Sequence, residues 1–175
     1  FDAHLALTGA QAARDAGLSG AGVAIGIVDS GVNRQHPALA GRVGVNFTYV
    51  NPVTNNLRVD DVVGHGTAVA QLAAGGVVGS WPGGIAPGAG ILSARIIADK
   101  APVDDGSGKG NEVNGALGFL PIHNDLIAAG MRIMNNSWGG LYWTNRNATA
   151  PIASEYRPFI FNNDGLVVFA SGNEG

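Results

Sequence analysis

Residues 23–31 have the sequence VAIGIVDSG, in which a mostly apolar run ends at the carboxylate of Asp29 and is followed by a glycine. The run does not alternate between apolar and polar residues, which is typical of a strand buried on both faces of a parallel sheet. Three further runs have the same character, at residues 91–97, 131–134 and 166–170. Segments with helical spacing separate them, and this order predicts an α/β sandwich with a mainly parallel sheet.

Two segments between these strands carry apolar residues at helical spacing. The first lies at residues 69–76, and the second at residues 113–120, before a break predicted at Pro121 because proline interrupts helices. The polar stretches at residues 50–59 and 141–150 are expected to be exposed surface loops. Since no linker interrupts the sequence, the chain is expected to be all or part of a single domain.

The composition indicates a compact globular domain and excludes several classes of protein. Hydrophobic residues make up 46% of the 175 residues and charged residues 13%, which is unlike a disordered chain. A net charge of -3 without a basic stripe argues against a nucleic-acid partner. The absence of cysteine excludes a thiolate nucleophile, a disulfide and a cysteine-based zinc site. No apolar run reaches the roughly 18 residues that a membrane span needs.

Two side chains with catalytic chemistry lie at the ends of predicted elements. Asp29 ends the first predicted strand, and the carboxyl ends of parallel strands are where α/β sheets bind ligands. His65 lies between two glycines at the start of a predicted helix, which leaves its ring uncrowded and able to exchange protons near neutral pH. Taken singly, the aspartate could be a turn residue and the histidine an ordinary exposed side chain.

Five blocks of sequence, in this order, resemble the subtilases, a family of serine peptidases. They are VDSG at residues 28–31, GHGT at 64–67, GIAP at 84–87, NSWGG at 136–140 and VFASGNEG at 168–175. The resemblance implies a subtilisin-like three-layer α/β sandwich that is incomplete at its C-terminus. Residues 1–175 would then be the N-terminal portion of one catalytic domain.

The resemblance also implies the chemistry of an Asp-His-Ser triad. Asp29 would orient His65, His65 would act as the base for a serine, and Asn173 would donate its side-chain amide to the oxyanion. No serine of the chain lies in the family's nucleophile segment, so that serine is expected downstream of the chain end, and the chain alone is expected to be inactive. The alternative is a subtilase-fold protein that binds peptides without cleaving them.

An extended peptide substrate is expected to add as a strand between two segments, because main-chain hydrogen bonds suit such recognition. The residues expected to form the two sides are Gly106, Ser107 and Gly108 on one, and Ser137, Trp138 and Gly139 on the other. Trp138 either lines a side-chain pocket or packs in the core. Further partners expected are a protein substrate and the C-terminal remainder of the same domain.

No cofactor or metal is required by this chemistry. Structural calcium is possible in such a fold, but residues 75–84, the loop after the histidine helix, contain no carboxylate or amide side chain to support it. The paired acids Asp60–Asp61 and Asp104–Asp105 could bind a cation, although solvated loop charges are the commoner explanation. Subtilases are usually secreted or at the cell surface, and a bacterial autotransporter-type subtilase is one such source.

Two rival interpretations fail on spacing. A dinucleotide-binding domain needs its glycines between strand and helix, whereas Gly20-Ala21-Gly22 precedes the first strand. A metallohydrolase of the H-E-x-x-H type needs paired histidines on one helix, and the histidines of this chain are scattered.

Overall fold

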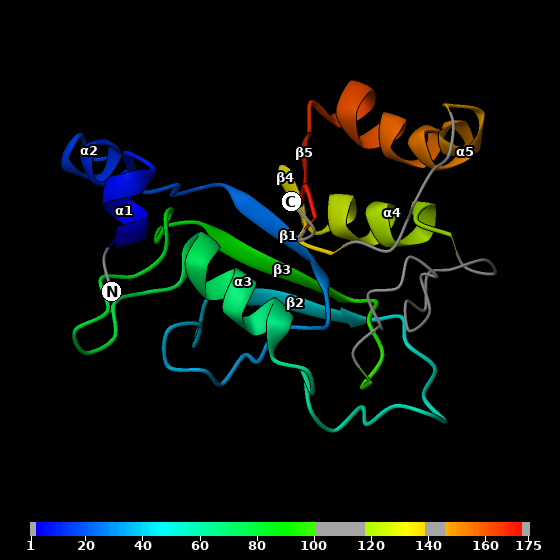
Figure 1. Cartoon of the computed structure of the whole chain (residues 1–175), viewed down its shortest axis with the longest axis horizontal. Helices are drawn as coiled ribbons and strands as arrows, with labels where there is room; N and C mark the ends of the chain where they lie inside the picture. The colour runs from blue at the N-terminus through cyan, green and yellow to red at the C-terminus, as the bar shows by residue number, and fades with distance from the viewer. Residues whose placement is uncertain (1–2, 101–117, 139–145, 173–175) are drawn as a thin grey trace.

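The described residues form a central five-stranded sheet in the order β2-β3-β1-β4-β5, in which every pairing is parallel. The computed structural model describes residues 3–100, 118–138 and 146–172 (Figure 1). The strands are β1 (Ala24–Asp29), β2 (Val43–Thr48), β3 (Gly90–Arg95), β4 (Ile133–Asn136) and β5 (Leu166–Phe169). The predicted parallel sheet is thereby confirmed.

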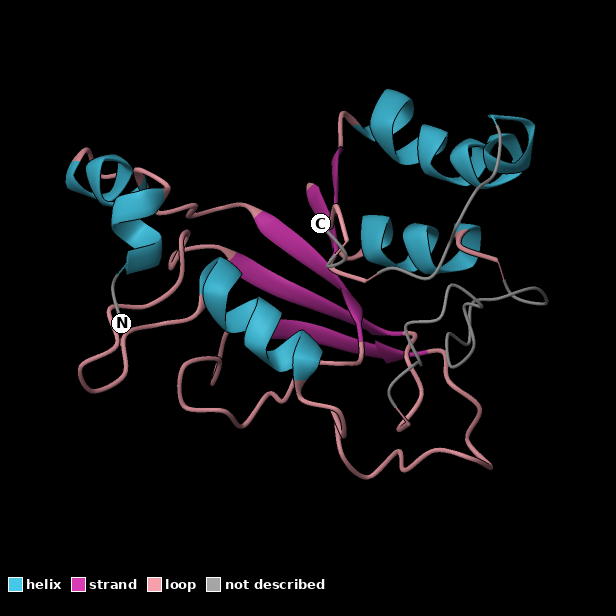
Figure 2. Cartoon of the chain, viewed as in Figure 1, coloured by secondary structure: helices cyan, strands magenta, loops and turns pink. Residues whose placement is uncertain are grey.

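Helices cover both faces of this sheet, which gives the expected three layers (Figure 2). On one face, α3 (His65–Ala74) packs Ala70 and Ala74 against a cluster that includes Ile25, Ile27 and Ile91. The buried residues of α3 are all small, so the helix lies close to β1; they are Gly66, Thr67, Ala70 and Ala74.

On the other face lie α4 (Leu120–Ala128), α5 (Arg146–Arg157) and a π-helical turn, η1 (Pro158–Asn162). Their core cluster includes Ile122, Leu126, Phe159 and Met134. Val28 of β1 belongs to the same cluster, so the central strand is buried from both sides.

The chain connections mark β1 and β3 as the switch point of the sheet. From β1 the chain continues to β2 at one edge, and from β3 it crosses to β4 on the far side of β1. Ligands of open α/β sheets bind outside the carboxyl ends of the strands at such a point. The residues at these two ends are Asp29 and Arg95, which pair in register.

Several local predictions were wrong. Pro121 opens α4 instead of ending a helix, because proline is tolerated in the first turn, where its missing N–H is not needed. Residues 146–150, expected in an exposed loop, begin α5. The edge strand β2 and the two N-terminal helices α1 (Ala3–Leu7) and α2 (Ala10–Asp15) were not predicted. Residues 113–117 of the second predicted helix lie outside the described residues.

The strand β5 was predicted correctly but is not buried on both faces. Leu166 is 58% exposed, Val168 42% and Phe169 48%. The strand pairs with β4 and forms the edge of the sheet among the described residues. No helix within the described residues is long and apolar enough to cross a bilayer.

Candidate active site

Asp29 is the last residue of the central strand, and its side chain is fully buried. Its Oδ1 atom accepts a hydrogen bond of 2.6 Å from the backbone N–H of Ser30. Its own carbonyl accepts a bond of 2.8 Å from the N–H of Ile96, just beyond β3. The carboxylate is therefore held rigidly at the switch point of the sheet.

His65 begins α3 and meets this carboxylate directly. Its Nδ1 atom lies 2.8 Å from Oδ1 and 3.0 Å from Oδ2 of Asp29. Because an ionised carboxylate only accepts, Nδ1 carries the proton and donates it. The ring is half exposed, so Nε2 is the nitrogen left to act on a ligand.

The electrostatics of Asp29 reflect its position. Burial raises the pKa of Asp29 above its ordinary value of 3.8, while hydrogen bonds from His65 and from the Ser30 N–H oppose that increase. The charge of the carboxylate is thus costly in the fold and is stabilised by its contact with the imidazole.

Gly66 is what allows α3 to approach the strand so closely. A Cβ atom at this position would lie 2.2 Å from the carbonyl oxygen of Gly31 and 3.1 Å from the Cβ of Asp29. The glycine after the histidine therefore makes room for the backbone that follows Asp29, and only this close approach brings His65 within hydrogen-bond distance.

We expect Gly66→Ala to push α3 away from β1 and, in a domain with the peptidase activity that the sequence resemblance implies, to lower kcat/KM by about 10 to 100-fold, since displacements on the order of 1 Å have such effects. Steady-state kinetics on a peptide substrate measure this. Gly44→Ala is the matched control, because the nearest atom to a Cβ there is Leu92 Cδ2 at an ordinary 3.5 Å. Equal activity of Gly66→Ala and Gly44→Ala would contradict the prediction.

The paired acids Asp60 and Asp61, which were considered as cation ligands, both have protein partners in the structure. Asp60 makes an ion pair of 2.9 Å with Arg34 at the surface. Asp61, expected to be a solvated loop charge, is instead only 9% exposed and bonds to the start of α3. The described residues contain no group of three potential ligands of the His, Cys, Asp or Glu type. The pair Asp104–Asp105 lies outside the described residues.

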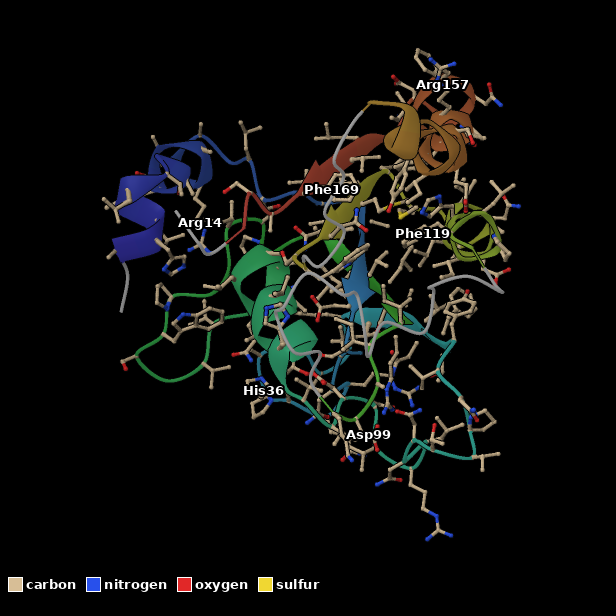
Figure 3. The ribbon with its side chains drawn as sticks, turned by 45° about the vertical axis from the view of Figure 1, so that its right-hand side comes forward. Arg14, His36, Asp99, Phe119, Arg157 and Phe169 are labelled. Carbon is tan, nitrogen blue, oxygen red and sulfur yellow. The ribbon has the colours of Figure 1, made fainter. Side chains whose placement is uncertain are left out.

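Trp138 is partly buried and packs against the core cluster that contains Phe119. It follows β4, stacks on Phe119 at a centroid distance of 5.6 Å and meets the edge of Phe169 at 6.4 Å. Figure 3 shows Phe119 and Phe169 on the side of the molecule that carries α4 and α5. Ser137 precedes Trp138, and its hydroxyl oxygen accepts a 2.8 Å hydrogen bond from the amide of Asn135. Both residues lie at the carboxyl edge of the sheet, as Asp29 does.

The remaining expected site residues lie outside the described residues. These are Gly106, Ser107, Gly108, Gly139 and Asn173. The described chain reaches Gly172, three residues beyond the end of β5. Sequence reasoning missed the roles of Ser30, Asp61 and Thr67 around the helix start. The aspartate four positions before the histidine was the available signal, since carboxylates are favoured at helix N-termini.

Comparison with known proteins agrees with this geometry. A family model described as "Subtilase family" matches residues 20–175. Thermitase from Thermoactinomyces vulgaris is 34% identical over 161 residues, which cover 89% of this chain and 49% of the relative. Subtilisin from Bacillus sp. (strain TA39) is 29% identical over 159 residues, which cover 89% of this chain and 35% of the relative.

A solved structure shares the fold. The MycP3 protease from the type VII (ESX-3) secretion system matches with a TM-score of 0.65 and 23% identity, over 98% of this chain and 45% of that chain. This chain therefore spans half or less of the length of the relatives that it matches.

Proposed function

Since the chain belongs to the subtilase family, we propose that Asp29 and His65 are the orienting acid and the general base of a serine endopeptidase. The observation that carries the proposal is the 2.8 Å contact between His65 Nδ1 and Asp29 Oδ1, made by a buried carboxylate and a half-exposed ring. A histidine that only packs in the fold would not need to leave half of its side chain exposed beside a buried carboxylate. The family supports a peptide or protein as the substrate.

In the proposed mechanism, His65 Nε2 takes the proton of a serine hydroxyl as the oxygen attacks the carbonyl carbon of the scissile bond. The nucleophilic serine is proposed to come from a segment outside residues 1–175, because the chain spans only part of the relatives that it matches. Asp29 keeps the proton on Nδ1 and stabilises the imidazolium. Asn173 donates to the oxyanion, and the imidazolium then passes its proton to the leaving amine. A water molecule then attacks the carbonyl carbon of the acyl-enzyme while His65 takes its proton. The ester bond breaks, and His65 returns the proton to the serine oxygen.

The substrate is proposed to bind as an extended strand between Gly106-Ser107-Gly108 and Ser137-Trp138-Gly139. The position of Ser137 and Trp138 directly after β4 supports this, because both follow a strand end at the same edge as Asp29. The packing of Trp138 on Phe119 favours a supporting role in the wall of the site over direct contact with a large substrate side chain.

We further propose that the exposed side of β5 is covered by the remainder of the catalytic domain. An apolar groove lies beside it, lined by residues that include Ile152, Tyr156, Phe161 and Phe169. Large contiguous apolar patches on a protein surface mark places where another surface packs. In the relatives, more than half of each protein lies outside the matched region.

Secretion or display at the cell surface is proposed for the whole protein.

The loop after α3 is proposed to be held by side chains instead of calcium. Arg14 donates one hydrogen bond of 2.9 Å to the carbonyl of Pro82 and a second to that of Gly84. His4 donates through Nε2 to the carbonyl of Gly83 at 2.9 Å. Carbonyls of this kind are among the oxygens that calcium takes as ligands. Here a guanidinium and an imidazole satisfy them.

We expect Arg14→Ala to lower the free energy of unfolding by about 1–3 kcal/mol, because charged hydrogen bonds to the loop are lost. Chemical denaturation of the complete domain measures this. The loss is expected to be the same in a chelator and in excess calcium. Gln11→Ala, which removes only an exposed contact with Asp15 in the same helix, is the control. Full recovery of Arg14→Ala by calcium would show that the loop is a cation site.

The proposed function is tested by incubating the complete catalytic domain with an unfolded protein substrate and identifying the products by mass spectrometry. New peptide termini are expected, and a serine-directed fluorophosphonate should abolish them. Binding of the substrate without cleavage would overturn the proposal and favour a peptide-binding protein with a subtilase fold.

A further inference from the structure

The structure holds a second carboxylate behind the Asp29–His65 pair, and we propose that Asp61 is a positioning residue for His65. The proposal rests on the function proposed above. The hydrogen bonds of Asp61 go to Ser30, Gly64 and Thr67, and not to Asp29 or His65. It acts through Ser30 and through the first turn of α3, which begins at His65.

Both carboxylate oxygens of Asp61 accept hydrogen bonds at the start of this helix. Oδ1 accepts a hydrogen bond of 2.8 Å from the Gly64 N–H and one of 2.9 Å from the Ser30 hydroxyl. Oδ2 accepts a bond of 2.9 Å from the Thr67 N–H and one of 2.5 Å from the hydroxyl of the same residue. Four donors therefore converge on one buried carboxylate.

These bonds replace a cap that the helix otherwise lacks. Gly64 at the N-cap has no side chain to bond the first turn, whose N–H groups have no partner within the helix. Asp61 takes the N–H groups of Gly64 and Thr67, and the Ser30 hydroxyl oxygen takes that of Gly66 at 2.9 Å. The backbone is thus fixed immediately before and immediately after His65.

Ser30 connects this turn to the other member of the pair. Its backbone N–H donates to Asp29 at 2.6 Å, while its hydroxyl donates to Asp61 and accepts from the Gly66 N–H. A hydroxyl has one proton, so donating it to Asp61 leaves the oxygen lone pairs free for Gly66. The orientation of Ser30 therefore depends on an acceptor at position 61.

Thr67 depends on the same acceptor. Its hydroxyl donates to Asp61 and accepts from the Asn33 N–H at 3.0 Å. An amide in place of the carboxylate would present one acceptor and one donor group, and the donor would face groups that also donate. Asp61→Asn therefore disturbs the network although it preserves size. The distance between His65 and Asp29 is expected to become variable as a result.

The test compares Asp61→Asn with Asp60→Asn in the complete catalytic domain. For Asp61→Asn, kcat is expected to fall about 100-fold with little change in KM, because the substrate still binds but the base is misplaced. Asp60→Asn removes a partly exposed carboxylate paired with the surface residue Arg34, and its kcat should be unchanged. Ile122→Ala, a cavity in the opposite core layer, controls for loss of stability and should lower the melting temperature without lowering kcat.

A second readout is the proton NMR signal of the His65 Nδ1–H group. In the unchanged domain this bonded proton should give a low-field resonance, and in Asp61→Asn the resonance should broaden or disappear through exchange with water. It should persist in Ile122→Ala. If Asp61→Asn does not fold, the same measurements are made on Ser30→Ala, which removes only the connecting hydroxyl. The same results are expected.

The two readouts separate the two proposals. If the unchanged domain cleaves no peptide, the proposed function fails, and the resonance still decides the role of Asp61. If the variant retains both kcat and the resonance, the positioning role is wrong while the peptidase function stands. A lower melting temperature with kcat and resonance unaltered would show that Asp61 only caps the helix.

Discussion

His65→Ala in the complete catalytic domain is expected to lower kcat on the order of 10⁶-fold, the size known for loss of the histidine base from subtilisin. The reason is that a serine hydroxyl is a poor nucleophile at neutral pH without a base to take its proton. The ring is half exposed, so its removal leaves little cavity and the fold should persist. Steady-state kinetics and circular dichroism measure the two effects.

His36→Ala is the matched control for this change. His36 lies outside the site, where its Nδ1 accepts a hydrogen bond of 3.2 Å from the N–H of Ala38. The control should retain turnover close to that of the unchanged domain. Ordinary turnover by a folded His65→Ala variant would remove His65 from the mechanism.

Asp29→Asn is expected to lower kcat about 10⁴-fold while leaving the fold intact. The amide can donate to Nδ1 of His65, which places the imidazole proton on Nε2 and leaves no base facing the serine. Asp125→Asn, a change at an exposed carboxylate bonded to Tyr49, controls for the loss of one negative charge. Comparable turnover by Asp29→Asn and Asp125→Asn would contradict the assignment of Asp29.

The stability of Asp29→Asn should depend on pH in a defined direction. Because the pKa of Asp29 is raised above 3.8 by burial, the folded state binds this proton more tightly than the unfolded state does. Binding of this proton therefore stabilises the unchanged domain at low pH, and that stabilisation is lost as the pH rises through the raised pKa. The amide variant has no such proton and shows no such loss. Relative to the unchanged domain, Asp29→Asn should gain melting temperature as the pH rises above 3.8. A relative loss over this range would contradict the direction.

Much of the fold could be predicted because the central strands are apolar on both faces. The apolar runs at residues 23–28 and 91–97 predicted strands, and the strands found there, β1 and β3, lie in the middle of the sheet. Edge elements were harder. In β2, small and polar residues alternate with apolar ones, a pattern typical of a half-buried strand that a search for continuous apolar runs does not find. The N-terminal helices are too short for a clear period. Pro121 misled because the rule that proline breaks helices does not hold in the first turn.

The candidate site could be predicted only in part, for a related reason. Asp29 and His65 were identified from motifs, since each lies in a short block of distinctive sequence. Asp61 was not, because two adjacent acids in a polar loop look like surface charges. Its burial depends on Ser30 and Thr67, which reach it only after the loop folds back onto β1. Such contacts between distant segments have no local signal.

The most direct test of the account is covalent labelling of the complete catalytic domain with a fluorophosphonate, followed by mass spectrometry to locate the label. The account predicts a single labelled serine, located after residue 175, and a labelling rate that falls by orders of magnitude in His65→Ala. No labelling of a folded domain, or equal rates with and without the imidazole of His65, would contradict it.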